Sequence, residues 1–237
     1  MRLDQFLVSK NFVESREKAK RLIKEGKIKI NDKICLKPSY QVKPEDKIEI
    51  KEILKFVSRG GEKLLFALKE FNISPLNKIC LDIGASTGGF VDCLIKNGAK
   101  KVYAIDIGTN QLHPCLRNNR RVISLEKTDI RKFEANKKFD LITVDLSFIS
   151  LKLVLKKIKN LLSQKGDLIL LFKPQFEVGK KYIKKGRVKD KEIITKALKE
   201  FLEFSKNLGF QIIKVLPSPI LGKKGNQEFF IYLKLLD

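Results

Sequence analysis

The sequence predicts an α/β protein with two domains: a small N-terminal α+β domain and a larger domain built on an open, mostly parallel sheet. Its 237 residues allow one or two domains at the usual spacing of about 100–200 residues each. The hydrophobic fraction of 43% is enough for a buried core, which excludes wholesale disorder. Beyond residue 60, short apolar runs alternate with amphipathic stretches, the pattern of βαβ units with helices on both faces of a sheet. We expect domains at 1–53 and 60–237, joined by a short linker at 54–59.

The excess of basic over acidic residues indicates what kind of molecule the protein binds. Lys plus Arg number 50 against 27 Asp plus Glu, a net charge of +23, which favours a polyanion: nucleic acid or an acidic membrane surface. No apolar run approaches the roughly 20 residues that span a bilayer. The cysteines are widely spaced and there is one histidine, so we expect no disulfide framework and no metal site. These features predict a cytoplasmic protein that binds nucleic acid and does not enter a membrane.

The N-terminal region is predicted to form two short helices followed by strands. Ser15 is a candidate N-cap for the second helix, and Gly26 ends that helix in the manner of a C′ glycine. Isoleucines then alternate with lysines up to a turn at Asn31-Asp32, and the alternation returns at 48–50.

One face of the second helix carries a basic ridge formed by Arg16, Lys20 and Lys24. On periodicity alone, this ridge fits an ordinary solvated helix face as well as an RNA contact. Together with Arg2-Leu3-Asp4 and Ile30-Asn31, however, the segment resembles the RNA-binding domain named after ribosomal protein S four. The resemblance covers nearly all of residues 1–50 and implies contacts with RNA phosphates and shape. The RNA-binding residues that it implies here are Arg2, Arg16, Lys20 and Lys24.

The second domain is predicted to begin with a helix after Gly60-Gly61. Further helices are expected at 151–162 and 192–207. The expected strands are Ile79–Ile83, Val102–Ile107, Val122–Leu125, Leu141–Val144, Leu168–Phe172, Gln211–Leu216 and Glu228–Leu235.

A glycine-rich loop follows the first of these strands. Its spacing over 84–89 is G-x-x-x-G-G, which is neither the G-x-G-x-x-G of dinucleotide binders nor a P-loop. Small residues let the backbone approach a ligand, and the next helix N-terminus offers free N–H groups. Asp106 ends the second strand about 20 residues later, where an acid can bind ribose hydroxyls. By themselves, this loop and acid also fit a structural turn or another nucleotide.

Four segments carry a second resemblance: 84–90, Asp145-Leu146-Ser147-Phe148-Ile149-Ser150, 173–179 and 225–229. Together they resemble the haemolysin A-like (TlyA) ribosomal RNA methyltransferases, whose catalytic domain is FtsJ-type and depends on S-adenosylmethionine. The match extends from residue 1 to about residue 235 and implies a Rossmann-like class I methyltransferase sheet. It implies a catalytic quartet of Lys63, Asp145, Lys173 and Glu228. The cofactor contacts that it implies are Asp82, Gly84, Ala85, Ser86, Thr87, Gly88, Gly89, Phe90, Asp106, Asp129 and Ile130, with Thr128 beside them.

The chemistry of methyl transfer to a ribose hydroxyl suits this quartet. The hydroxyl is a poor nucleophile, so the enzyme must align it with the methyl group and accept its proton. A lysine can be that base only if its pKa is lowered by burial or a neighbouring cation. We interpret Lys173 as the base, with Lys63 lowering its pKa and orienting the hydroxyl. Asp145 and Glu228 would position the two lysines, although an acid held too close would instead raise the pKa of its lysine. Taken singly, each residue could equally form a salt bridge at the rim.

A lysine-rich segment from 179 to 192 follows Lys173 closely. A solvated loop would explain it, but its position predicts a mobile loop that closes on RNA phosphates. Its candidate RNA-binding residues are Lys180, Lys181, Lys184, Lys185 and Arg187.

Comparison with other methyltransferase classes favours ribose as the acceptor. Enzymes that methylate base amino groups carry an Asn/Asp-Pro-Pro-aromatic motif after the fourth strand, whereas residues 145–148 here read Asp-Leu-Ser-Phe. Enzymes that methylate cytosine carbon use cysteines near the fourth and fifth strands, where this sequence has none.

The resemblance also predicts the substrate, and the sequence departs from the family pattern at one motif. The chain resembles the shorter family type, which modifies a cytidine of large-subunit ribosomal RNA only. No obligate protein partner is implied. The linker motif Arg-x-Trp-Val of many members is replaced by residues 54–57, Leu-Lys-Phe-Val. The alternatives are a non-catalytic RNA- or ribosome-binding factor, and a membrane-active haemolysin, which would need an amphipathic insertion segment.

Overall fold

The computed structural model describes residues 1–50 and 55–236, and the chain divides into two compact units, Met1–Lys55 and Phe56–Asp237. The expected end of the first domain at 51–53, the linker residue Leu54 and the final Asp237 lie outside the described residues.

The first unit packs two helices on a small antiparallel sheet. Helices α1 (Leu3–Ser9) and α2 (Arg16–Lys24) precede strands β1 (Ile28–Ile30), β2 (Lys33–Ile34) and β3 (Ile48–Ile50), in the sheet order β2-β1-β3. Apolar side chains from α1, α2 and β1 form its core.

The local sequence signals of this unit take the expected forms. Ser15 Oγ accepts a hydrogen bond from the backbone N–H of Lys18 (3.2 Å), which caps α2. Gly26 follows the helix with φ +70°, as a C′ glycine does. Asn31 and Asp32 both have positive φ, at 49° and 66°, which matches a tight turn between two strands.

The second unit is built on a seven-stranded sheet in the order β6-β5-β4-β7-β8-β10-β9. Strands β4 to β8 pair in parallel, and β10 runs antiparallel to both of its neighbours. The strands are β4 (Ile79–Ile83), β5 (Lys101–Ile105), β6 (Val122–Leu125), β7 (Phe139–Val144), β8 (Leu162–Phe172), β9 (Phe210–Pro217) and β10 (Phe229–Leu235). The helical segments are α3 (Arg59–Glu70), α4 (Gly89–Lys96), α5 (Pro114–Arg117), α6 (Lys152–Leu161), α7 (Pro174–Glu177), the 3-10 turn η1 (Lys180–Tyr182) and α8 (Lys191–Asn207).

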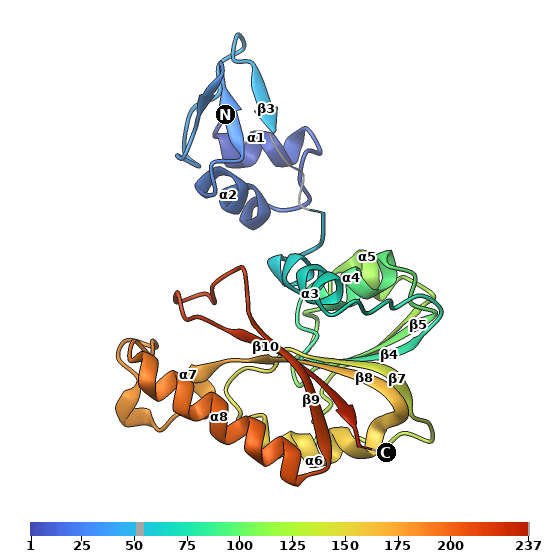
Figure 1. The fold of residues 1–237 in the computed structure, drawn as a ribbon. Helices are drawn as coiled ribbons and strands as arrows, with labels where there is room; N and C mark the ends of the chain where they lie inside the picture. Colours follow the sequence, from blue (N-terminus) through green and yellow to red (C-terminus); the bar gives the residue numbers. More distant parts are fainter. Residues whose placement is uncertain (51–54, 237) are drawn as a thin grey trace. The chain divides into compact units, whose positions relative to one another are not determined.

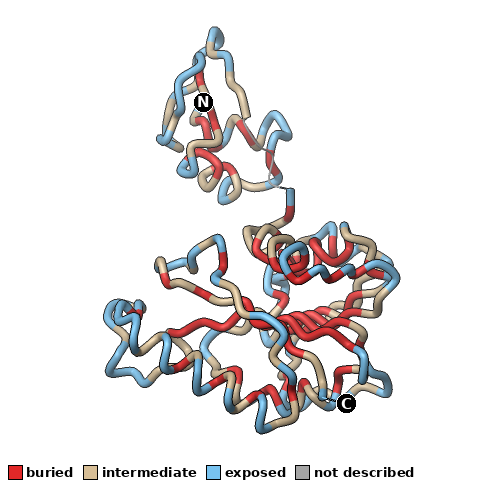
Figure 2. The backbone as a smooth tube through the Cα atoms, viewed as in Figure 1, coloured by how far each residue is buried: buried red, intermediate tan, exposed pale blue. Residues whose placement is uncertain are grey.

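Helices cover both faces of this sheet, as the βαβ alternation predicts. Helices α3 and α4 lie on one face and α6 and α8 on the other (Figure 1). The strands between them are the most buried part of the unit (Figure 2). Because successive side chains of a strand point to opposite faces, Ile169 and Leu171 join the core under α3 and α4, whereas Leu168 and Leu170 join the core over α6 and α8. The predicted three-layer α/β architecture is confirmed.

The start of this unit differs from the expectation. Gly60 and Gly61 lie inside the first turn of α3, not ahead of it. Close packing explains the glycine at position 61, because a Cβ there would lie 2.3 Å from Cγ of Phe56. Phe56 itself, expected in the linker, is 1% exposed and belongs to the core of the second unit. Strand β8 also starts earlier than expected, at Leu162, directly after α6.

Candidate active site

Two lysine–carboxylate ion pairs lie at one edge of the sheet. Lys63 Nζ is 2.5 Å from Glu228 Oε2, and Lys173 Nζ is 2.6 Å from Asp145 Oδ1. Both pairs are largely withdrawn from solvent, since the exposed side-chain fractions are 11% and 4% in the first pair and 10% and 27% in the second. All four members of the predicted quartet are therefore engaged pairwise.

The topology explains why these residues meet. Asp145 follows β7 and Lys173 follows β8, so the carboxyl ends of two parallel neighbours deliver both to the same edge. Strand β10 runs antiparallel to β8, and Phe229 pairs with Phe172. Glu228, just before β10, therefore lies beside Lys173, just after β8. Helix α3, which lies on the sheet face, supplies Lys63.

Two further residues support the loops that carry Asp145 and Lys173. Lys173 Nζ also donates a hydrogen bond to Ser147 Oγ (3.0 Å). Glu177, in α7, accepts hydrogen bonds from Ser150 Oγ (2.6 Å) and from the N–H of Leu151 (2.8 Å). Burial raises the pKa of Glu177 above its ordinary value. Sequence reasoning assigned no role to Ser147 or Glu177; only their place in the 145–150 and 173–179 motifs could have drawn attention to them.

The glycine loop lies against the same edge. Gly84 has φ +87°, and a Cβ there would lie 2.6 Å from the carbonyl oxygen of Asp145, so the loop and the catalytic strand end pack backbone to backbone. Gly88 has φ +92° and would clash with Leu116 at 2.4 Å. Any side chain at these two positions would push the loop away from its neighbours.

Asp106 connects the glycine loop to the segments that follow β5 and β6. Its carboxylate accepts hydrogen bonds from the backbone N–H of Ser86 and of Gly108, both at 2.7 Å, and its carbonyl oxygen accepts one from Thr128 N–H (2.9 Å). A narrow pocket beside it is lined by Ala85, Ser86, Ala104, Asp106, Gly108, Gln111, Leu112, Ser124 and Glu126.

Asp82 is a buried acid beneath this loop. It is 1% exposed, and its Oδ1 accepts a hydrogen bond from Thr143 Oγ1 (2.7 Å). Within the described residues, its Oδ2 is buried without a hydrogen-bond partner. Burial, together with the negative charges of Asp145 and Asp106, raises the pKa of Asp82 to about 8. The site thus contains a largely protonated acid with one oxygen that lacks a hydrogen-bond partner among the described residues.

The other implied cofactor residues lie in different settings. Asp129 forms an ion pair with Arg131 (2.6 Å), which lowers the pKa of Asp129 to about 2. Ile130 is 4% exposed and belongs to the core. Phe90, in α4, also packs in the core and stacks with Phe230.

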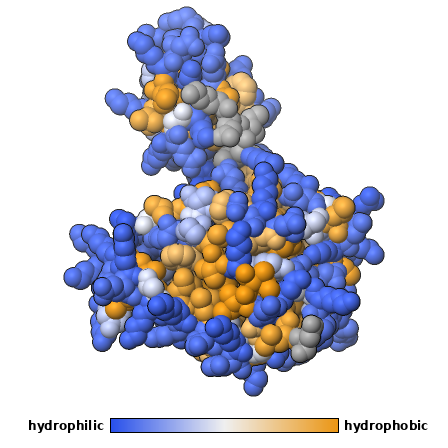
Figure 3. All heavy atoms as spheres, in the orientation of Figure 1, coloured by the Kyte–Doolittle hydropathy of each residue, from blue (hydrophilic) through white to orange (hydrophobic). Residues whose placement is uncertain are grey.

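Within the lysine-rich segment, residues Lys184 to Arg187 form a tight turn, and the mobility expected of the segment remains a prediction. Lys184 and Arg187 exchange two backbone hydrogen bonds (2.9 and 3.0 Å), and the central residues Lys185 and Gly186 have positive φ of 52° and 77°. Gly225 and Asn226, far along the chain, form hydrogen bonds with this turn. All five candidate RNA-binding side chains of the segment are exposed: Lys180, Lys181, Lys184, Lys185 and Arg187. Hydrophilic residues gather at the end of the unit where α7 and the start of α8 lie (Figures 1 and 3).

In the first unit, the predicted RNA-binding arginines share one acid. Asp4 is fully buried and pairs with both Arg2 and Arg16 at 3.0 Å, and these hydrogen bonds lower the pKa of Asp4 to about 2. The two arginine side chains remain 39% and 46% exposed. Lys20 and Lys24 lie on the same helix, half-buried and exposed respectively.

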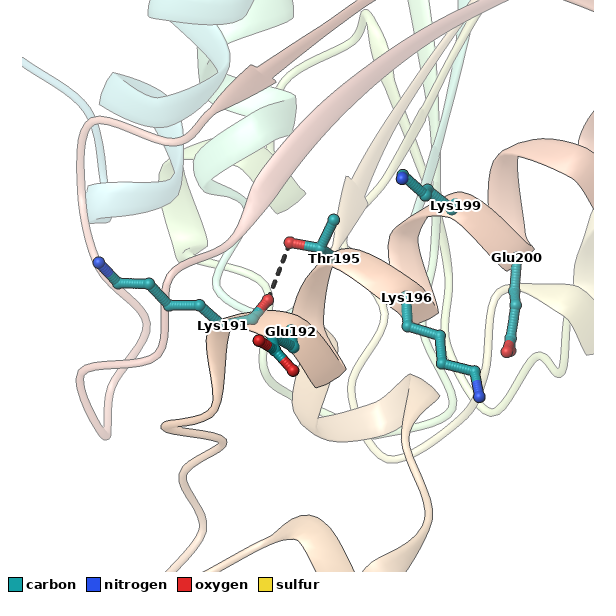
Figure 4. Close-up of a pocket in the computed structure, with 6 residues that line it drawn as sticks. All are labelled: Lys191, Glu192, Thr195, Lys196, Lys199 and Glu200. Carbon is teal, nitrogen blue, oxygen red and sulfur yellow. Dashed lines mark hydrogen bonds between the residues drawn. The ribbon is translucent and has the colours of Figure 1, made fainter.

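A shallow depression of the surface lies along α8, away from the quartet. All six of its lining residues, including Lys191, Thr195 and Glu200, come from α8 (Figure 4). A shallow surface along a single helix, with no quartet residue, does not provide converging groups for catalysis.

Within residues 1–50 and 55–236, no helix is long and apolar enough to cross a membrane.

Known proteins share this arrangement of domains. The S4 domain family matches residues 1–48, and the FtsJ-like methyltransferase family matches residues 56–235. The chain is 44% identical to the 23S rRNA (cytidine-2'-O)-methyltransferase TlyA of Campylobacter jejuni, with 98% of each chain covered. It is 37% identical to the 16S/23S rRNA (cytidine-2'-O)-methyltransferase TlyA of Mycobacterium tuberculosis, covering 98% of this chain and 89% of that one.

A solved structure shows that the similarity extends to the three-dimensional fold. The structure of a candidate hemolysin from Streptococcus thermophilus superposes with a TM-score of 0.79 at 39% identity, covering 100% of this chain and 89% of that one. Sequence and structure agree over both domains. The chain therefore belongs to the TlyA family of FtsJ-like methyltransferases that carry an N-terminal S4 domain.

Proposed function

We propose that this chain uses S-adenosylmethionine to methylate the 2′-hydroxyl of a cytidine in ribosomal RNA, and that its substrate is the large subunit. The observation that carries the proposal is the two ion pairs, Lys63–Glu228 and Lys173–Asp145, beside the glycine loop. Support for the large subunit comes from the 44% identity to the 23S enzyme of Campylobacter jejuni over nearly the whole of both chains.

The residues around the glycine loop fit the proposed cofactor. S-adenosylmethionine is a nucleoside that carries a sulfonium and an ammonium group, and carboxylates complement such cations. Asp106 stands beside the narrow pocket and can supply such a carboxylate. Asp82, which holds a proton at neutral pH, offers a buried oxygen without a hydrogen-bond partner among the described residues and can form a hydrogen bond to the cofactor. The backbone of 84–90, with Asp82, Asp106, Asp129 and Ile130, would hold the cofactor. When bound, it supplies a methyl group already activated for transfer.

The chain's own residues then have to orient the hydroxyl and remove its proton. Lys173 can act as the base only as a neutral amine, so it must first lose its own proton. As the ribose oxygen bonds to the methyl carbon and the bond from that carbon to sulfur breaks, the hydroxyl proton passes to Nζ of the neutral Lys173, which Asp145 and Ser147 hold from two directions. Lys63, held by Glu228, provides a fixed positive charge that stabilises the negative charge developing on that oxygen. Positioning of this kind accounts for a large share of the rate in bimolecular transfers.

RNA binding is assigned to two separate surfaces. The first is the basic ridge of α2 with Arg2, and the second is the turn formed by Lys184 to Arg187. Both offer exposed cations to phosphates, which suits recognition of RNA by shape.

We further propose that the protein acts in the cytoplasm, where its four free cysteines are stable, without an obligate protein partner or a metal. We also propose that residues 1–53 form the RNA-binding domain and that residues 60–237 contain the methyltransferase site.

Labelled S-adenosylmethionine and purified ribosomal subunits that lack the modification test this proposal. Methyl label on a cytidine ribose of the large subunit is the expected result. Label on both subunits would correct the substrate range and leave the reaction intact. Label on a base, or RNA binding without label, would overturn the assigned reaction, and the second result would favour the non-catalytic factor.

A further inference from the structure

Asn226 is a buried carboxamide that no step of the reaction above uses. It is 4% exposed and lies two residues before Glu228, in the segment that leads into β10. Its Oδ1 accepts a hydrogen bond from the N–H of Val188 (3.0 Å), and its Nδ2 donates one to the carbonyl oxygen of Gly186 (2.9 Å). One side chain therefore binds both polar groups at the base of the lysine-rich turn.

Other contacts bring the two segments into close packing. Arg187 Nη2 donates a hydrogen bond to the carbonyl oxygen of Gly225 (3.2 Å). The side chain of Lys224 lies over Gly186, where a Cβ would be 2.5 Å from its Cδ, so the turn and the 222–226 loop are in contact here as well. Val188, which ends the turn, is buried. The basic turn therefore packs against the loop that directly precedes Glu228.

We propose that Asn226 is a positioning residue that fastens the basic turn Lys184–Val188 to the segment bearing Glu228, so that phosphates bound by the turn lie in a fixed relation to the Lys63–Glu228 pair. This inference rests on the proposed function, because it assigns the turn to RNA. Asn226 touches neither the reacting atoms nor the substrate. It acts through the two groups that it joins.

The local chemistry requires an amide at this position. The site needs one acceptor for Val188 N–H and one donor for the carbonyl of Gly186, and asparagine supplies both with two bonds of fixed geometry. Aspartate keeps the acceptor but sets a carboxylate oxygen against that carbonyl. Alanine leaves both backbone groups buried without a partner, which is costly.

The test compares Asn226→Ala and Asn226→Asp with wild type and with Asn97→Ala. Asn97 is a matched control, since its side chain donates to the carbonyl of Cys93 in α4, away from the turn. Three quantities are measured: tryptic cleavage after Lys184, Lys185 and Arg187, the salt dependence of RNA binding, and kcat separately from KM on ribosomal subunits. S-adenosylmethionine affinity is measured alongside.

We expect both Asn226 variants to be cut in the turn about 10-fold faster, since each lost buried hydrogen bond costs on the order of a tenfold change in an equilibrium. The slope of log affinity against log salt should fall by about 1, because one phosphate contact is lost on average. KM for RNA should rise and kcat fall, while cofactor affinity and the Asn97→Ala control stay at the wild-type level.

The results that would overturn the role of Asn226 differ from the result that would refute the proposed methylation. Faster cleavage with wild-type kcat, KM and salt slope would show that Asn226 holds the turn without positioning anything, and would overturn the inference. Unchanged cleavage would overturn it as well. Absence of ribose methylation by the wild-type chain would instead refute the proposed function, while the cleavage comparison would still report whether Asn226 fastens the turn.

Discussion

Lys173 Nζ lies 2.6 Å from Asp145 Oδ1 and 3.0 Å from Ser147 Oγ, so one buried amine is held by two residues of the loop that follows the neighbouring strand. This contact joins the ends of β7 and β8, which are adjacent parallel strands. This contact fixes the position of Lys173 Nζ, the atom to which the proposal assigns the proton of the ribose hydroxyl.

Lys173→Ala is expected to retain S-adenosylmethionine binding and to lose methyl transfer by about 100-fold or more, the range of general-base contributions. Single-turnover methylation and calorimetric binding of the cofactor measure the two effects. Lys165→Ala is the matched control, because Lys165 is exposed on the same strand and makes no contact with the quartet residues. Methylation retained by Lys173→Ala would remove this residue as the base.

The Lys63–Glu228 pair should behave as a buried ion pair in a double-mutant cycle. Glu228→Gln alone leaves a largely buried ammonium group without its counter-charge and should destabilise the fold by about 3–5 kcal/mol. Lys63→Met combined with Glu228→Gln should regain most of that free energy of unfolding without regaining activity. Urea unfolding and methylation assays measure the two quantities. Additive losses in stability would show that the two side chains are not coupled.

The raised pKa of Asp82 predicts a specific dependence of stability on pH. Between its ordinary value of 3.8 and about 8, the folded chain holds a proton at Asp82 that the unfolded chain has released. The contribution of this site to the free energy of unfolding therefore falls as pH rises through that window. Asp82→Asn cannot titrate, so its stability relative to wild type should increase from pH 5 to pH 8. Parallel stability curves for the two proteins would contradict the raised pKa.

The basic ridge of α2 should contribute to RNA affinity without base specificity. Lys24→Ala is expected to weaken binding to unrelated RNAs by a similar factor and to lower the salt slope by about 1. Lys33→Ala, an exposed lysine on β2, serves as the control. Filter binding over a salt series measures both. Equal effects of the two substitutions would mean that the ridge is only a solvated helix face.

Sequence reasoning predicted the parts of the site that depend on strand ends. Residues that directly follow parallel neighbours must meet at one edge, so the convergence of Asp145 with Lys173 could be expected from the βαβ pattern. The resemblance to the TlyA family implied Lys63 and Glu228, and the structure pairs them at 2.5 Å. Their catalytic roles remain predictions.

The supporting hydrogen bonds could not be predicted in the same way. Thr143 binds Asp82 across 61 residues of sequence, and Asn226 binds Val188 across 38. Such partners depend on side-chain directions that only the assembled sheet and loops define. The lysine-rich segment shows the same limit, because its charge predicted RNA contact, but nothing in its composition indicated the tight turn held by Asn226.

The most direct test of the central claim is nucleoside analysis of ribosomal RNA after reaction with the purified chain and S-adenosylmethionine. Large subunits lacking the modification should gain one 2′-O-methylcytidine with wild-type protein and none with Lys173→Ala. A methylated base in place of 2′-O-methylcytidine, or equal methylation by wild type and Lys173→Ala, would contradict ribose methylation with Lys173 as the base.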